Sequence, residues 1–315
     1  MKFIESFREG DKISEIYLCK YKQSATAKNG KLYENVVLQD KTGTSVAKIW
    51  YPITSGIEEF GVLDYVFVNG DITNFQGTLQ MSIRRARKAQ ESEYTPADYL
   101  PVSEKNIDEM YEELMEYMRQ VENPYLQKLI QMYFVDHEAC IEALKIHTAA
   151  KTGHHSFVGG LLEHTLGVVK LCDFYVKQYP YLQKDLLLTA ALFHDVGKLK
   201  EISNFPENDY TDDGQLLGHI VMGSELVGFG CRHIKGFPKR LMSELQHCIL
   251  AHHGELEFGS PKKPALAEAL ALNYADDTDA KLETMREALK AAGDNTEWLG
   301  YNRLFESNIR KTSEF

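Results

Sequence analysis

The sequence predicts an α+β protein of two domains, a small five-stranded β-barrel followed by an all-helical domain. Three observations support this prediction. Residues 1–90 contain short β-rich segments separated by turn sequences. A polar stretch with two prolines, 91–106, interrupts that pattern and is expected to be a linker. From 107 to 292 the apolar residues recur with the 3.6-residue period of helices.

The expected strands are short, rich in β-branched and aromatic residues, and partly alternating. They cover 13–18, 33–38, 45–50, 65–69 and 79–83. Turn sequences such as Asp40-Lys-Thr-Gly and Asn69-Gly-Asp separate several of them. Five strands in so short a segment favour a closed barrel over a sandwich, and the OB-fold is the commonest five-stranded barrel. We therefore expect an OB-like domain over 1–90.

The helical domain is expected to begin at Ile107, with Ser103 as a candidate cap. Later helices are predicted over 123–135, 137–150, 159–178, 184–196, 217–229, 238–252 and 265–291. Residues 293–315 form a tail whose apolar side chains we expect to pack on the helical domain. These side chains are Trp298, Tyr301, Leu304 and Phe305.

Charge is distributed unevenly along the chain. The formal net charge of −11 argues at first against a nucleic-acid partner. Residues 1–90, however, hold 13 Lys and Arg against 10 Asp and Glu, whereas the remainder holds 22 against 36. The basic residues gather near the end of the barrel segment, at Arg84, Arg85, Arg87 and Lys88. The front domain is therefore the better candidate for binding a polyanion.

Membrane and redox features point to a cytoplasmic protein without a membrane partner. The longest apolar run, 186–193, is interrupted by Thr189 and is too short to span a bilayer. Charged residues follow the N-terminus at once, so no signal peptide is expected. Five cysteines are scattered without a CxxC pair, which suits a reducing compartment. The composition leaves a homo-oligomer open.

A series of histidines and aspartates indicates a metal site. Its members lie in successive apolar helical stretches and can therefore face inward, as ligands in helical bundles do. They are His164, His194-Asp195, His219, His252-His253 and Asp276. Imidazole and carboxylate ligands together suit Mn, Fe, Co, Ni or Zn, and one carboxylate can bridge two ions. Lys198 follows Asp195 closely and could hold a phosphate oxygen.

Other histidines are better explained as structural residues. An isolated helical histidine is most often hydrogen-bonded within the fold, and four histidines are given that interpretation: His137, His147, His233 and His247. His154 and His155 precede the Gly159-Gly160 pair and could either contact substrate or cap the loop.

The ordered series His, His-Asp-x-Gly-Lys, His, His-His, Ala-Asp resembles that of the HD superfamily of metal-dependent phosphohydrolases. With an OB-like domain in front, the whole chain is similar to the YhaM-type 3′→5′ exoribonucleases. The resemblance implies metal ligands at His164, His194, Asp195 and Asp276. For a second ion it implies ligands at His219, His252 and His253, with Asp195 as the bridge and catalytic centre. Asp277 and Asp279 lie close to Asp276, and the pattern does not decide firmly between the three.

The resemblance also implies cofactor and substrate. It suggests Mn²⁺ or Co²⁺, with Fe, Ni, Zn or Mg as further options and one or two ions in the site. The implied substrate is single-stranded RNA, cut from its 3′ end to nucleoside monophosphates. Single-stranded DNA remains an option, because nothing in the residues themselves distinguishes the two nucleic acids.

The barrel segment offers residues for binding a single strand, because OB barrels stack bases on aromatic side chains while basic residues follow the phosphates. The candidates are Tyr33, Trp50, Tyr51 and Phe75 for stacking, with Lys31, Lys48, Arg84, Arg85 and Arg87 for phosphate. Each aromatic could instead belong to the barrel core. Neighbouring strand residues point to opposite faces, so at most one of Trp50 and Tyr51 can do so.

Two other functions compete with an exoribonuclease. One is an HD enzyme acting on small nucleotides, such as a nucleotidase or a cyclic-nucleotide phosphodiesterase. The other is a non-enzymatic single-strand-binding or replication-associated protein. The complete set of candidate metal ligands counts against it, because such a protein would have no use for them.

Overall fold

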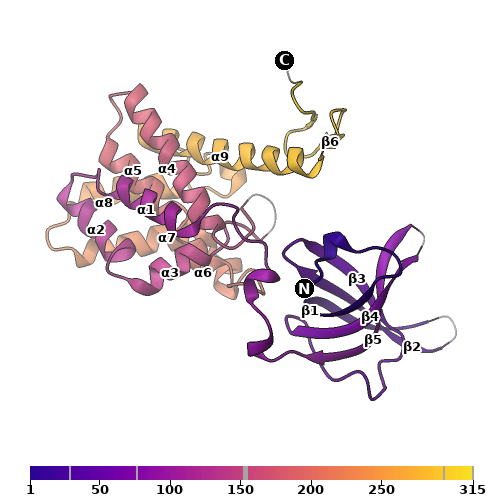
Figure 1. Ribbon diagram of the computed structural model, residues 1–315. Helices are drawn as coiled ribbons and strands as arrows, with labels where there is room; N and C mark the ends of the chain where they lie inside the picture. Colours follow the sequence, from indigo (N-terminus) through magenta and orange to yellow (C-terminus); the bar gives the residue numbers. More distant parts are fainter. Residues whose placement is uncertain (28–29, 76, 152–154, 294, 314–315) are drawn as a thin grey trace. The chain divides into compact units, whose positions relative to one another are not determined.

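The computed structural model describes residues 1–27, 30–75, 77–151, 155–293 and 295–313. The chain forms two compact units (Figure 1). The first consists of residues 1–102 with 205–207, and the second is the remainder.

Five strands build the first unit: β1 (Lys12–Thr26), β2 (Leu32–Asp40), β3 (Gly43–Ile49), β4 (Tyr65–Phe75) and β5 (Thr78–Lys88). They form a closed barrel in the order β1-β2-β3-β5-β4. β3 and β5 pair in parallel, and the other neighbouring pairs are antiparallel. This is a five-stranded barrel, and the OB-like fold predicted for the front of the chain is confirmed.

Alternation of apolar and polar residues explains the barrel core. Val36 and Leu38 of β2 and Ala47 and Ile49 of β3 are fully buried, while their strand neighbours are less so. The β2–β3 turn falls where the sequence predicts it. There the Asp40 carboxylate accepts hydrogen bonds from the Thr42 backbone N–H at 2.8 Å and from its hydroxyl at 2.6 Å.

The observed strands are longer than the expected ones, because edge residues of β1 and β2 pair without contributing to the core. β1 continues to Thr26, which pairs with Leu32. One glycine is required by close packing of β4 and β5. A Cβ atom at Gly70 would collide with the Ser82 backbone carbonyl, beside a bulge in the β4–β5 pairing.

The second unit is helical. Its helices are α1 (Ile107–Met118), α2 (Pro124–Phe134), α3 (Glu138–Ile146), α4 (Gly160–Gln178), α5 (Lys184–Phe193), α6 (Lys198–Glu201), α7 (Asp212–His233), α8 (Lys239–Leu250) and α9 (Ala267–Ala291). Every residue from Leu186 to Phe193 is buried, so α5 is apolar all round and central. Among the described residues, no helix has the length and apolar character needed to cross a bilayer.

Several helix ends differ from expectation. Asn106, not Ser103, caps α1, because its side-chain carbonyl accepts from the N–H groups of the first turn. α7 begins at Asp212, five residues before the predicted start at 217, and it is kinked at Gly218, whose φ is 74°. α3 ends at Ile146 rather than at 150.

The C-terminal segment corrects the expectation for its apolar side chains. A short hairpin, β6 (Tyr301–Asn302) with β7 (Ser307–Asn308), lies beyond the end of α9 (Figure 1). Trp298, Tyr301 and Leu304 are each more than half exposed. Among the described residues of this segment, Ile309 is the buried one. The three exposed side chains are therefore not the packing contacts that their size suggested.

Candidate metal centre

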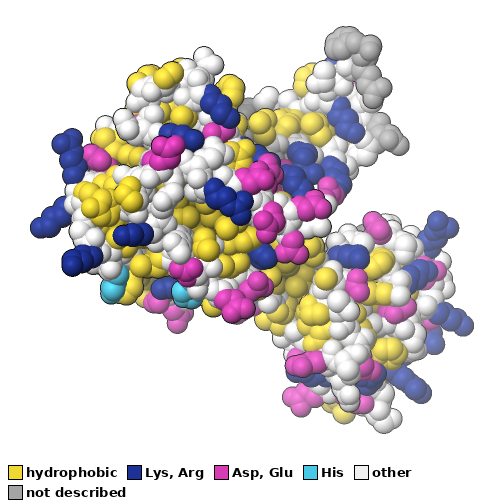
Figure 2. Space-filling view, turned by 60° about the vertical axis from the view of Figure 1, so that its left-hand side comes forward, with side chains coloured by type: hydrophobic (Ala, Val, Ile, Leu, Met, Phe, Trp, Pro, Cys, Tyr) yellow, Lys and Arg dark blue, Asp and Glu magenta, His cyan; other side chains and the backbone are white. Residues whose placement is uncertain are grey.

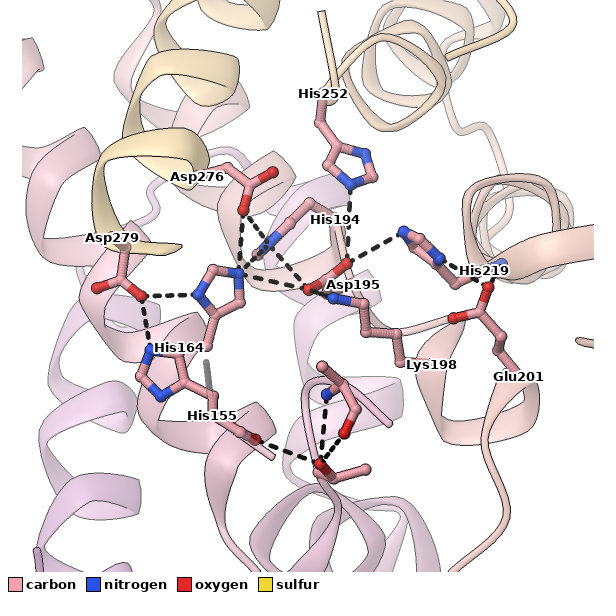
Figure 3. A network of polar contacts seen from close by, with 12 residues as sticks. His155, His164, His194, Asp195, Lys198, Glu201, His219, His252, Asp276 and Asp279 are labelled. Carbon is pink, nitrogen blue, oxygen red and sulfur yellow. Dashed lines mark hydrogen bonds and ion pairs between the residues drawn. The ribbon is translucent and has the colours of Figure 1, made fainter. Parts of the chain in front are cut away.

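The histidines and aspartates of the predicted series converge in the helical unit. Figure 3 shows all of them except His253. They come from five places along the chain. His164 lies on α4, His194 and Asp195 end α5, His219 lies on α7, His252 and His253 follow α8, and Asp276 lies on α9. All except His253 and Asp276 are buried, and those two are partly buried. Asp195 follows the buried stretch 186–193 of α5, which explains how a carboxylate comes to lie in the centre of the bundle.

Four of these residues form a first cluster. His164 Nε2 lies 3.1 Å from Asp276 Oδ1 and 3.4 Å from Asp195 Oδ2. His194 Nε2 lies 3.5 Å from the same Asp195 Oδ2 and 3.3 Å from His164 Nε2. Two imidazole nitrogens and two carboxylates thus surround one small volume. We call these four residues cluster A.

Three histidines form a second cluster on the other side of Asp195. The ligand atoms of His219, His252 and His253 lie within 4.8 Å of one another. His219 Nε2 is 3.4 Å and His252 Nε2 is 3.7 Å from Asp195 Oδ1. We call this group cluster B. Asp195 therefore directs one oxygen to each cluster, which is the arrangement of a bridging carboxylate.

Hydrogen bonds on the far side of each imidazole orient its Nε2 towards the clusters. In each of the five rings Nδ1 faces an oxygen at 2.7–2.9 Å. The acceptors are Asp279 for His164, the Ala191 carbonyl for His194, Glu201 for His219, and the Ile249 and Phe258 carbonyls for His252 and His253. Because these oxygens accept, the proton belongs on Nδ1 and the Nε2 lone pair faces the site. This is the state in which imidazole binds a metal.

The donor set fits a divalent cation. Asp195 Oδ1, His219 Nε2 and His252 Nε2 are buried, and none has a hydrogen-bond partner among the described residues, while Asp195 Oδ2 contacts the Lys198 ammonium. Leaving a buried polar atom unpaired costs about 1–3 kcal/mol. Several such atoms facing one another are accounted for by cations that they would share. In cluster A, His164 Nε2 and His194 Nε2 lie 3.3 Å apart beside two carboxylates, an arrangement that also suits a shared cation.

Electrostatics at the centre also favour a cation. Burial raises the pKa of Asp195, but the Lys198 charge and the surrounding histidines outweigh burial and hold that pKa well below its usual range. Burial lowers the pKa of His164, yet hydrogen bonds to three carboxylates outweigh it and raise that pKa well above normal. The carboxylates that favour a proton on His164 would equally favour a metal ion.

Lys198 supplies a fixed positive charge beside the clusters. Its Nζ lies 2.6 Å from Asp195 Oδ2, and its side chain is mostly buried. Burial lowers the lysine pKa, but the Asp195 charge outweighs it and raises that pKa above its ordinary value. The lysine is therefore cationic at neutral pH and borders the same cleft as His219 and Asp276.

Comparison with known proteins agrees with this geometry. The family model described as HD domain matches residues 161–281, which run from α4 to α9. The chain is 33% identical over 290 residues to the 3′-5′ exoribonuclease YhaM of Geobacillus sp. (strain WCH70), covering 92% of this chain and 88% of that protein.

The chain belongs to the YhaM family of 3′-5′ exoribonucleases. It is thus an HD-domain hydrolase, and its HD segment contains every residue of clusters A and B. Membership of this family argues against the alternative of a non-enzymatic single-strand-binding or replication-associated protein.

The second OB-fold domain of replication protein A from Methanococcus maripaludis also matches. It is 19% identical, with a TM-score of 0.20 over 26% of this chain and 85% of that one. The barrel assignment rests on strand order and not on that likeness.

Within the YhaM-family chain, the three neighbouring aspartates have different surroundings. Asp276 faces the cluster A histidines. Asp277 points outwards and forms an ion pair with Lys281 at 2.8 Å. Asp279 accepts from His164 Nδ1 at 2.7 Å and contacts His155 Nε2 at 3.0 Å. The geometry therefore favours Asp276 as the ligand and places Asp279 behind a ligand.

The predicted substrate contact at His155 does not fit its position. The side chain is buried, contacts Asp279, and packs against the rings of Phe157 and His164. It is not among the residues that line the cleft. A tight turn causes this, since Gly159 adopts a φ of 83° and a Cβ at Gly160 would collide with the His155 carbonyl. His154 lies outside the described residues.

Sequence reasoning missed two kinds of supporting residue. Glu201 holds His219 through both its ring and its backbone N–H, which the kink at Gly218 leaves available. Gly167 and Gly197 let other parts of the site pack directly against their backbones. A Cβ at Gly167 would collide with the Asp279 side chain, and a Cβ at Gly197 would collide with the His219 carbonyl. Gly197 is the glycine of His-Asp-x-Gly-Lys, so the motif itself carried that signal.

The four histidines interpreted as structural have such roles. His137 caps α3 by accepting from the Cys140 N–H at 3.2 Å. The other three bond to backbone groups within the fold: His147 to Thr148 and Ile202, His233 to Phe229, and His247 to Ala265.

In the barrel unit, three of the predicted stacking residues, Tyr33, Trp50 and Phe75, lie around the Lys48 side chain. Tyr33 and Trp50 stack with ring centroids 5.3 Å apart. Lys48 Nζ lies 5.2 Å from the Tyr33 ring, 5.1 Å from Trp50 and 6.0 Å from Phe75. We call these four residues the barrel aromatic cluster. Trp50 and Phe75 are exposed, so neither belongs to the core.

The remaining barrel predictions are less well supported by position. Tyr51 is 63% exposed, so neither it nor Trp50 faces the core. Arg84 forms an ion pair with Asp71, and Arg85 is exposed on the same strand. Arg87 is engaged by Glu93 through two hydrogen bonds of 2.7 Å. No contact among the described residues joins these arginines to the barrel aromatic cluster.

Proposed function

We propose that the chain is a metal-dependent 3′→5′ exoribonuclease that hydrolyses single-stranded RNA to nucleoside monophosphates. The observation that carries the proposal is the position of Asp195, which directs one carboxylate oxygen to each of two clusters of Nε2 atoms. Family membership supports the RNA substrate and the direction, since the YhaM relative is named for that activity.

The proposed ligands are His164, His194, Asp195 and Asp276 for one ion, and His219, His252, His253 and Asp195 for the other. Mn²⁺ or Co²⁺ suits this mixture of imidazole and carboxylate. Bound there, the ions would supply Lewis acidity and a bound water of lowered pKa, and a pair of ions can stabilise both oxygens of an in-line displacement.

The protein's own residues prepare the phosphodiester. Lys198 carries a fixed charge into the cleft and can hold a non-bridging phosphate oxygen as charge develops on it. The hydrogen bonds at each Nδ1 hold the imidazoles in one tautomer and orientation before substrate arrives. Asp195 stays ionised, because cationic and polar neighbours surround it.

The barrel would bind the strand. Lys48 amid the rings of the barrel aromatic cluster combines stacking with charge, which suits single strands of any sequence. Figure 2 shows Lys and Arg side chains gathered along one edge of the barrel unit. Single-stranded DNA shares this chemistry and is a second substrate to test. Five free cysteines support the cytoplasm as the site of action.

The test uses single-stranded RNA carrying a 5′ label. With Mn²⁺, the intact protein is expected to shorten the RNA stepwise and to release nucleoside 5′-monophosphates, identified by chromatography. Excess chelator should stop the reaction, and added Mn²⁺ should restore it. Hydrolysis of mononucleotides or cyclic nucleotides without shortening of RNA would instead support the small-nucleotide alternative.

A further inference from the structure

A cleft of about 500 Å³ opens beside the metal centre. Its lining includes four residues of the catalytic region, Lys198, His219, His253 and Asp276. The volume lies in the range of about 300–1,000 Å³ that is typical of small-molecule sites. Three aromatic side chains line the same cleft, namely Tyr210, Phe258 and Tyr274. The proposed hydrolysis of the phosphodiester does not require these three side chains.

These three aromatic side chains are exposed to solvent and are not packed in the core. Their exposed fractions are 44% for Tyr210, 65% for Phe258 and 57% for Tyr274. Core aromatics of this unit contact one another, as Phe134 and Phe193 do at 4.8 Å between ring centroids. None of the three contacts another aromatic ring among the described residues. One exposed aromatic is ordinary, but three on a single catalytic cleft indicate a binding surface.

The face of α9 that borders the cleft shows how a strand could follow it. Leu270, Tyr274, Asp277 and Lys281 are spaced at i, i+4, i+7 and i+11, and all four line the cleft. Tyr274 precedes the proposed ligand Asp276 by two residues. An apolar and aromatic surface is therefore followed, along one helix, by the metal centre and then by a Lys–Asp pair.

Nucleotide chemistry matches this arrangement. A strand whose scissile phosphate lies at the metal centre must place its terminal base nearby. Aromatic rings bind the faces of bases without regard to sequence, whereas a hydrolase for simple phosphate esters would have no need of them. Phe258 follows cluster B on the η4 turn (Leu256–Phe258), so a second ring approaches from a different element.

We propose that Tyr274 and Phe258, with Tyr210 beside them, form a base-stacking subsite for the 3′-terminal nucleotides of the substrate. The inference rests on the proposed function for the position of the phosphate. It adds the residues that hold the base, and it predicts that the enzyme tolerates all four bases at the end that it shortens.

The experiment compares two RNAs that differ only at the 3′-terminal residue, which carries its base in one and lacks it in the other. For the intact protein with Mn²⁺, kcat/KM is expected to be about tenfold higher for the RNA with the base. Tyr274→Ala should remove most of that preference, chiefly by raising KM for the RNA with the base more than KM for the abasic RNA. Tyr274→Phe should keep the preference. Tyr181→Ala serves as the matched control, because Tyr181 is also more than half exposed and lies outside the cleft lining.

A binding measurement separates this inference from the proposed function. Calorimetry with adenosine 5′-monophosphate and with ribose 5-phosphate, both in chelator, should show tighter binding of the first to the wild type and no preference in Tyr274→Ala. An unchanged base preference in Tyr274→Ala, or an equal loss on both RNAs, would overturn the subsite. If the wild type shortens no RNA but still prefers the nucleotide, the exonuclease proposal fails while the subsite stands.

Discussion

The metal centre and the barrel aromatic cluster are built in opposite ways. At the metal centre, buried imidazoles and carboxylates converge from five stretches of chain, and each ring is held by an oxygen behind it. In the barrel, exposed rings gather around Lys48 with few contacts that fix them. Buried polar groups must be satisfied, so their identities are tightly constrained, whereas an exposed stacking surface tolerates change. Chemistry should therefore depend on single residues in the first region, and binding should be shared among residues in the second.

The largest expected effect separates the two regions directly. His194→Ala and Asp195→Asn should each lower kcat on RNA by roughly a thousandfold or more, because each removes a ligand and its share of charge stabilisation. RNA affinity, measured by fluorescence anisotropy in chelator, should change little. If these variants lost RNA binding together with activity, the division of labour between the regions would be wrong.

Changes in the barrel should have the opposite signature. Trp50→Ala with Phe75→Ala is expected to weaken single-stranded RNA binding by about tenfold or more, because each base–aromatic stack contributes about 1–3 kcal/mol. Hydrolysis of bis(p-nitrophenyl) phosphate, which needs no strand, should keep the wild-type kcat/KM. Tyr21→Ala, an exposed tyrosine elsewhere on the barrel, is the control. Unchanged RNA turnover in the double variant would favour a small-nucleotide enzyme.

The aspartates on α9 provide a smaller and sharper comparison. Asp279→Asn should reduce metal affinity by about 10- to 100-fold, because its carboxylate fixes the tautomer and orientation of His164. Asp277→Asn should leave metal affinity unchanged, since this carboxylate pairs with Lys281 near solvent. Titration of the metal-free protein with Mn²⁺ measures both. Equal effects of the two substitutions would contradict the assigned roles.

The smallest effect is expected at the exposed arginines. If Arg85 contacts a phosphate, Arg85→Ala should lower the slope of log affinity against log salt by about 0.7 on single strands. Arg84→Ala should do less, because Asp71 already neutralises that side chain. A salt series of anisotropy titrations distinguishes the two variants.

The sequence alone located the strands and the ligand series, because both follow from short-range patterns. Alternation predicted the strand over 33–38, which lies within β2, and the His-Asp-x-Gly-Lys stretch placed Asp195 at the end of an apolar helix. Local patterns do not give the rotation of α9 about its axis, which decides between Asp276 and Asp277. The partner of a buried ring is equally non-local, as for Glu201 behind His219.

The exposed regions were predicted least well, for a related reason. Trp298 and Tyr301 looked like core residues by size, yet both are exposed in the segment beyond α9. Large apolar side chains at the surface are common, so size alone does not report burial. From the sequence, Trp50 could likewise have been a core residue or a surface residue. The structure decides this, because the Trp50 side chain is exposed.

The central claim is that Asp195 lies between two bound ions, and anomalous diffraction from crystals grown with Mn²⁺ tests it most directly. We predict two manganese peaks, one surrounded by cluster A and one by cluster B, each within about 2.6 Å of an Asp195 oxygen. Manganese bound elsewhere, or absent from both clusters while the crystals contain active protein, would contradict the account.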